Sequence, residues 1–139
     1  MISPHLGTAH LTDHAFVEAF ETCQLPAAQF HHADHIRLAW IYLGRFSEEA
    51  ATERIEQSIV RFAMHNGASQ KYHRTITVAW MKLVSAARNE GAAASFQDFA
   101  ELHPQLLDVK HLTHYYSAEL LASPEARVAW LEPDIGHLP

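Results

Sequence analysis

The sequence predicts an all-α fold, packed as a compact single domain of about five or six helices. Apolar residues recur at three- and four-residue spacing along most of the chain, which is the period of an amphipathic helix. No useful length of chain alternates apolar and polar residues as a half-buried strand does, and the valines are scattered along helical stripes. The chain has 139 residues, of which 48% are hydrophobic and 19% charged, and this composition favours one domain with its own core.

The first half of the chain is expected to form an irregular arm and three helices. Thr12 or Asp13 can cap the first helix, which must end before Pro26. Ser47 is a suitable cap for the third helix, and Gly67 follows the end of its apolar stripe. The expected segments are the arm over residues 1–11 and helices over about 12–24, 32–45 and 47–66.

The second half is expected to continue with shorter helices. An apolar stripe that includes Trp80 predicts a helix from Arg74 or Thr75 to about Gly91. Ser95 with Asp98 resembles a capping box, and Ser123 followed by a proline is typical of a helix start. The expected segments are helices over about 74–91, 95–103, 109–120 and 123–131, and a non-helical tail over 132–139.

Composition excludes several classes of partner. Ten basic and sixteen acidic residues give a net charge of −6 with no run of Lys or Arg, which disfavours binding to nucleic acid. No stretch of about 18 apolar residues is present and the N-terminus lacks the pattern of a signal peptide, so we expect no membrane partner. The single Cys23 allows no intramolecular disulfide, and a cytoplasmic location is therefore the expectation.

Histidines are concentrated in three short stretches, which hold six of the twelve in the chain. His32 and His35 stand three residues apart at an expected helix start, so their imidazoles would share one face of that helix. His73 lies at another helix start and could supply a third ligand. Three imidazoles with an open position suit a transition metal ion such as zinc, iron or copper. We therefore predict a metal site formed by His32, His35 and His73.

The residues around these histidines suggest a metal-dependent enzyme that acts on a small molecule by hydrolytic or oxidative chemistry. The metal would polarise the substrate or activate water or oxygen. Tyr72 or Thr75 would donate a hydrogen bond to the bound group, and Asp34 would orient a ligand or, as the simpler role, cap its helix. Arg37 could clamp an anionic group, although a local ion pair with Asp34 is the simpler expectation.

Further residues are candidates for a substrate pocket, and a second class of function stays open. His111 and His114 repeat the three-residue spacing, and with Tyr115 they could line a pocket. Thr77 and Arg37 complete this predicted set. The alternative function is a metal-free module that binds a small ligand or a partner protein, in which the histidines and tyrosines form a polar pocket. The oligomeric state is left open.

Two motifs resemble those of a family of small, uncharacterised all-α bacterial proteins. They are F-x-H-x-x-H-x-R-x-A-W over residues 30–40 and K-Y-H-x-T-I-T over residues 71–77. The resemblance extends from about Phe30 to the C-terminus and implies that the motif residues form one functional set in a bacterial cytosolic protein. Where this family usually has Glu after the second motif's histidine, the chain has Arg74, which can neither accept a proton nor bind a metal. The set implied by the resemblance is His32, His35, His73, Thr75 and Thr77.

Overall fold

The computed structural model describes residues 7–139, and the regular secondary structure of this part of the chain is all helical with no strand, which confirms the predicted all-α class. The expected five or six helices were too few. The part of the predicted arm before Gly7 lies outside the described residues. The α-helices of the described chain are α1 (Asp13–Glu21), α2 (His32–Arg45), α3 (Glu48–His65), α4 (Arg74–Asn89), α5 (Phe96–Leu102), α6 (Ala118–Ala122) and α7 (Pro124–Val128), and its 3₁₀ helices are η1 (Ala27–Gln29), η2 (Ser69–Lys71), η3 (Pro104–Leu107) and η4 (Val109–His114).

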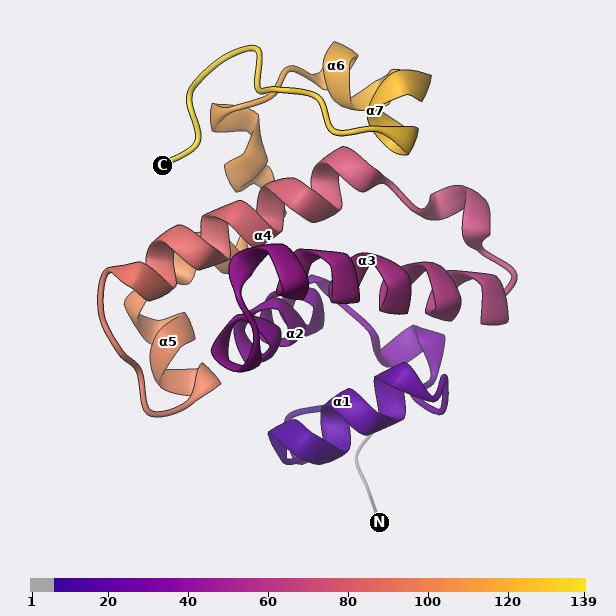
Figure 1. Ribbon diagram of the computed structural model, residues 1–139, viewed down its shortest axis with the longest axis vertical. Coiled ribbons are helices and arrows are strands. Elements are labelled where there is room, and N and C mark those ends of the chain that lie inside the picture. Colours follow the sequence, from indigo (N-terminus) through magenta and orange to yellow (C-terminus); the bar gives the residue numbers. More distant parts are fainter. Residues whose placement is uncertain (1–6) are drawn as a thin grey trace.

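Helix α4 lies at the centre of the fold. Helices α2 and α3 pack against it on one side, and α7 packs against it on the other, where the C-terminal segment also lies (Figure 1). Helix α1 packs on α3, and α5 contacts α2. Burial of large side chains between these layers is the main stabilising contribution. The largest fully buried aromatic side chains are Trp80, Tyr42, Tyr116, Phe16, Phe20 and Phe99.

Local sequence signals explain where most helices begin. Ser47 accepts a hydrogen bond from the Ala50 amide at 3.2 Å, and Ser95 and Ser123 cap α5 and α7 in the same way. Helix α1 ends at Glu21, before the expected Gln24. Cys23 adopts a φ of 60°, a left-handed conformation that a continuing helix cannot contain.

The predicted helix over residues 109–120 is wrong, because this stretch is divided into η4 and α6. Ser117 interrupts it as the N-cap of α6, with extended backbone. The carboxylate of Asp134 accepts hydrogen bonds from the Ser117 amide at 2.8 Å and from its hydroxyl at 2.5 Å. The Tyr115 carbonyl accepts a bond from the Ile135 amide at 2.9 Å. Contacts with a distant segment therefore replace the continuation of the helix.

The last helix is also shorter than expected, because α7 ends at Val128 and not near Leu131. The hydroxyl of the buried Thr75 donates a hydrogen bond to the Ala129 carbonyl at 2.7 Å and accepts one from the Leu131 amide at 3.1 Å. These bonds hold the segment in an extended path along α4. The residues that follow, 132–139, form no helix.

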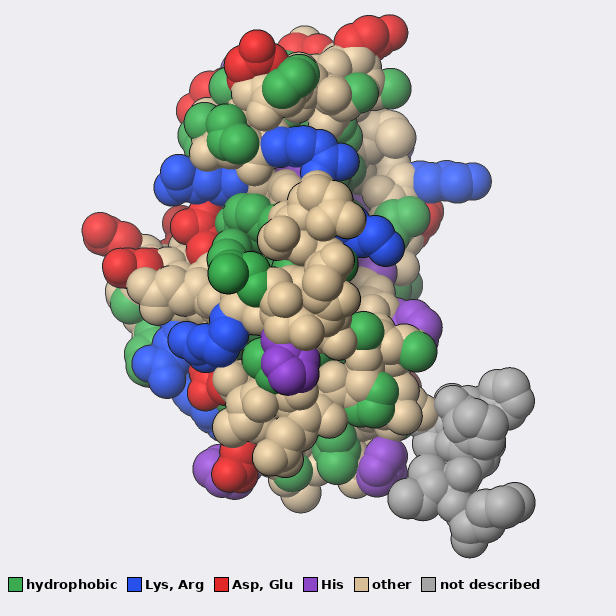
Figure 2. Space-filling view, turned by 90° about the vertical axis from the view of Figure 1, so that its right-hand side faces the viewer, with side chains coloured by type: hydrophobic (Ala, Val, Ile, Leu, Met, Phe, Trp, Pro, Cys, Tyr) green, Lys and Arg blue, Asp and Glu red, His purple; other side chains and the backbone are tan. Residues whose placement is uncertain are grey.

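The surface carries no extended patch of one charge on the face that Figure 2 shows. Acidic and basic side chains are interspersed there, and several histidines lie among them (Figure 2). Among the helices of residues 7–139, none combines the length and the apolar character that crossing a membrane requires.

Candidate functional site

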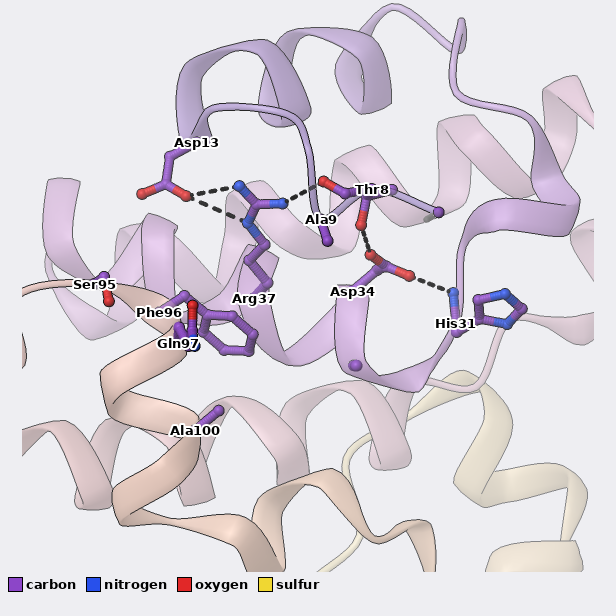
Figure 3. A pocket seen from close by; sticks show the side chains of 12 residues that line it. Thr8, Ala9, Asp13, His31, Asp34, Arg37, Ser95, Phe96, Gln97 and Ala100 are labelled. Carbon is purple, nitrogen blue, oxygen red and sulfur yellow. Dashed lines mark hydrogen bonds and ion pairs between the residues drawn. The ribbon is translucent and has the colours of Figure 1, made fainter. Parts of the chain in front are cut away.

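A pocket of about 600 Å³ lies between the N-terminal segment, the start of α2 and the start of α5 (Figure 3). We call it the N-terminal pocket. Its apolar surface comes from Phe96 and several alanines, and its polar groups come from the segment before α1 and from the starts of α1, α2 and α5. The lining residues are Gly7, Thr8, Ala9, Asp13, His31, Ala33, Asp34, Arg37, Ser95, Phe96, Gln97 and Ala100.

Arg37 forms the polar wall of this pocket and is only 9% exposed. Its Nη1 donates to the Thr8 carbonyl at 3.0 Å and its Nη2 to the Leu11 carbonyl at 2.7 Å. Its Nε and Nη2 both donate to Asp13 Oδ1, at 3.3 and 3.0 Å (Figure 3). The guanidinium also lies 4.6 Å from the centre of the Phe16 ring. Arg37 therefore pairs with Asp13 and not with Asp34, the partner expected from helical spacing.

Asp34 is the second buried charge of this wall, at 8% exposed. One carboxylate oxygen accepts a hydrogen bond from the Thr8 hydroxyl, and the other accepts one from the His31 amide at 2.8 Å (Figure 3). The second bond satisfies an amide at the first turn of α2, so Asp34 has the capping role that its position suggested. Together Asp34 and Arg37 hold the N-terminal segment against α2, which gives the pocket a fixed wall.

Four of the five predicted histidines lie in a separate group together with one tryptophan and one tyrosine. We call this group the histidine cluster: His32, His35, Trp80, His111, His114 and Tyr115. The His32 ring packs on Trp80 with centroids 4.5 Å apart, and the His32 and His35 centroids are 6.4 Å apart. His111 lies 6.5 Å from Trp80 and 5.3 Å from His114, again between centroids. His111 and Tyr115 are in edge contact at 5.5 Å. The structure therefore joins the first and third histidine stretches through one tryptophan.

Burial keeps the innermost imidazoles of this cluster neutral near pH 7. It lowers the pKa of His35 to about 4, and the neighbouring His32 adds to the shift. It also lowers the pKa of His32, against the opposing effect of a 2.8 Å hydrogen bond to the Leu106 carbonyl. His35 Nε2 is buried without a hydrogen-bond partner among the described residues. Uptake of a proton at His35 is therefore unfavourable in the folded protein.

His73 lies apart from both groups, at the start of α4. Its Nδ1 accepts a hydrogen bond from the Ile76 amide at 3.1 Å, which makes it the N-cap of this helix. Because Nδ1 accepts, the proton of a neutral ring is on Nε2, which donates to the Leu121 carbonyl at 2.7 Å. Both ring nitrogens of His73 are thus engaged with the backbone.

The donor set predicted for a metal is therefore not brought together in this geometry. A metal at His73 would have to replace the Ile76 or the Leu121 hydrogen bond. Residues 7–139 contain no group of three His, Cys, Asp or Glu side chains arranged to hold a metal ion. The zinc, iron or copper site stays a prediction.

The two threonine hydroxyl groups of the second motif are hydrogen-bonded to the backbone. Thr75 is fully buried, and its hydroxyl is bonded to the Ala129 and Leu131 backbone. The Thr77 hydroxyl, also buried, donates to the His73 carbonyl at 2.9 Å. This geometry leaves neither threonine hydroxyl facing a substrate.

Tyr72 and Arg74 lie on the α3 side of the α4 start, where they line an open groove. Burial raises the pKa of Tyr72 to about 12, with a further contribution from the charge of Glu56. Arg74 forms a 3.0 Å ion pair with Glu56. Tyr72 therefore holds its proton near neutral pH, and no histidine is among the residues that line its groove.

Sequence reasoning missed the residues that complete the N-terminal pocket. Thr8 lies in a segment that the sequence predicts to be irregular, and the pattern around Asp13 indicates only a possible helix cap. The one usable signal was Arg37, a charged residue on the buried side of an amphipathic helix, which requires a partner somewhere in the fold. Phe96, Gln97 and Ala100 come from a helix more than fifty residues later in the chain, so no local pattern linked them to Arg37.

No protein-family model, curated protein or solved structure matches the chain. The resemblance of its two motifs to a bacterial family therefore stays a prediction.

Proposed function

We propose that the protein is a metal-free binding module that takes a small organic molecule in the N-terminal pocket. The observation that carries this proposal is a concave site of about 600 Å³ with one wall fixed by buried, hydrogen-bonded charges. Pockets of roughly 300–1,000 Å³ that combine apolar surface with a few placed polar groups are typical small-molecule sites. Binding there requires neither the histidine cluster nor His73.

The way the wall is held supports binding of a ligand without a large rearrangement. Arg37 and Asp34 are bonded to the backbone or side chains of the segment before α1. Their positions are set by these bonds before any ligand arrives, so little ordering cost is left for the binding step. Phe96 and Ala100 of α5 supply apolar surface on the same pocket.

A fragment screen by ligand-observed NMR tests the proposal. We expect hits that bind the wild type equally well with and without EDTA. Ala100→Trp would fill the pocket and abolish their binding, whereas Ala50→Trp, on an exposed position of α3, would leave it unchanged. Circular dichroism would verify that both variants are folded. Equal loss in the two variants, binding that EDTA abolishes, or a screen without hits would contradict the proposal.

A further inference from the structure

The charges on the wall of the N-terminal pocket do not balance. Its ionisable lining residues are Asp13, Asp34, Arg37 and His31. Two carboxylates face one guanidinium, so the wall carries an excess negative charge when His31 is neutral. The whole chain has a net charge of −6, which adds to the attraction of cations.

The guanidinium of Arg37 is poorly placed to recognise an anion. A guanidinium has five N–H groups. Four hydrogen bonds from Arg37 go to the Thr8 carbonyl, the Leu11 carbonyl and Asp13 Oδ1. An anionic ligand would therefore have to compete with these bonds and would also meet the Asp13 and Asp34 carboxylates. The anion clamp considered for Arg37 from the sequence is thus disfavoured.

Asp13, in contrast, has one carboxylate oxygen that Arg37 does not use. Both bonds from Arg37 end on Oδ1, and Oδ2 accepts no hydrogen bond from the described residues. The Asp13 side chain is 45% exposed, whereas the Arg37 side chain is 11% exposed. In Figure 3 the second carboxylate oxygen of Asp13 points away from the guanidinium, and Phe96 is drawn near the backbone end of the Arg37 side chain.

From this arrangement we infer that the N-terminal pocket selects a small organic cation, an ammonium or amidinium group joined to an apolar or aromatic body. The inference rests on the proposed binding function and adds the chemical class of its ligand. Asp13 Oδ2 would accept the N–H groups of the cation, and Phe96 with the neighbouring alanines would contact the body. Asp34, which is buried and bonded through both oxygens to Thr8 and His31, would act through its charge.

Three probes of nearly equal shape and different charge test the inference: 2-phenylethylammonium, 2-phenylethanol and phenylacetate. Their dissociation constants for the full chain are measured by NMR titration at low ionic strength. We expect the cation to bind about fivefold more tightly than the alcohol, the scale of a partly exposed ion pair. Phenylacetate should bind more weakly than the alcohol. Added salt should reduce both differences, because it screens exposed charges.

Asp13→Asn gives a sharper result than a simple loss of binding. The substitution removes the acceptor charge and leaves one carboxylate and one guanidinium on the wall, so the preference for the cation over the alcohol should be lost while the apolar body still binds. Glu49→Gln, an equal charge change at an exposed position in the first turn of α3, should keep the wild-type order. The wild-type comparison does not depend on either variant folding.

The outcomes separate the two proposals. Equal affinity for the three probes, or tightest binding of phenylacetate by the wild type, would overturn the cation preference and leave small-molecule binding intact. If the cation binds the Asp13→Asn variant as tightly as the wild type, Asp13 is not the recognition group and the inference fails. The absence of binding by all three probes would also overturn it, and a fragment screen without hits would then remove the binding function as well.

Discussion

The His73 ring and the Leu121 carbonyl are joined by a 2.7 Å hydrogen bond across 48 residues of sequence. The same ring caps α4 through the Ile76 amide. One side chain therefore starts the central helix and fastens the end of α6 to it.

His73→Ala is expected to lower the free energy of unfolding by about 2 kcal/mol, about half from the lost cap and half from the lost bond to Leu121. His73→Asn should recover the cap and lose only about 1 kcal/mol, because asparagine is a good N-cap but is too short to reach Leu121. Urea unfolding monitored by circular dichroism measures both values. The losses should be the same in EDTA and in added zinc; zinc stabilisation of the wild type that disappears in His73→Ala would instead support the metal prediction.

Acid is expected to destabilise the fold through His35. Its pKa is about 4 in the folded protein and 6.5 in its ordinary state, so between these values the unfolded chain takes up a proton that the folded chain does not. The free energy of unfolding should therefore fall as pH decreases from about 6.5 to 4, by up to about 3 kcal/mol from this residue. His32, whose pKa is also lowered, contributes in the same direction.

Urea unfolding at a series of pH values measures this dependence. His35→Leu should flatten the curve between pH 6.5 and 4, whereas His65→Gln, at an exposed position, should leave its slope unchanged. A wild-type curve that is flat over this range would show that the imidazole of His35 is not held neutral by burial.

Arg37→Lys is expected to loosen the N-terminal segment. An ammonium group cannot reproduce the planar fork that serves Thr8, Leu11 and Asp13 together. Hydrogen–deuterium exchange of peptides covering residues 7–13 should accelerate about tenfold, the factor that corresponds to about 1.4 kcal/mol. Arg54→Lys alters a more exposed ion pair and should leave this exchange unchanged. Equal exchange in wild type and Arg37→Lys would mean that the guanidinium bonds do not hold the segment.

Thr75→Val is expected to be strongly destabilising although it preserves the shape of the side chain. It leaves the Ala129 carbonyl and the Leu131 amide without their partner, at a cost of about 3 kcal/mol. Thr75→Ser keeps the hydroxyl and loses one buried methyl group, which should cost about 1 kcal/mol. Chemical unfolding compares the two variants. A larger loss for serine than for valine would show that packing, and not hydrogen bonding, governs this position.

The parts of the fold that could be predicted are those whose signals are local. Ser47, Ser95 and Ser123 each cap a helix in the structure, because a cap involves only residues two or three positions away. Helices α3 and α4 followed from their apolar stripes for the same reason. Ser117 shows the limit, since its partner Asp134 is 17 residues away and ends a helical pattern that local spacing would continue.

In the candidate site, too, local spacing identified the residues but not their distant partners. Helical spacing suggested Asp34 as the partner of Arg37, yet Asp34 is taken by Thr8 and the His31 amide, and Arg37 turns to Asp13. The histidine motifs predicted metal ligands, but spacing alone could not distinguish an imidazole bonded to backbone from one free to bind a metal. His73 is the example, since both of its partners depend on the tertiary fold.

The two bonds of the Thr75 hydroxyl have a consequence for the order in which the protein can fold during synthesis. Helix α4 leaves the ribosome long before residues 129–131, so its buried threonine must wait without native partners while the intervening chain is made. The central helix can therefore complete its native bonding only after residues 129–131 have left the ribosome. Until then, the side of α4 that α7 covers in the folded protein is open to other contacts. This exposed side is where a chaperone could bind the incomplete chain.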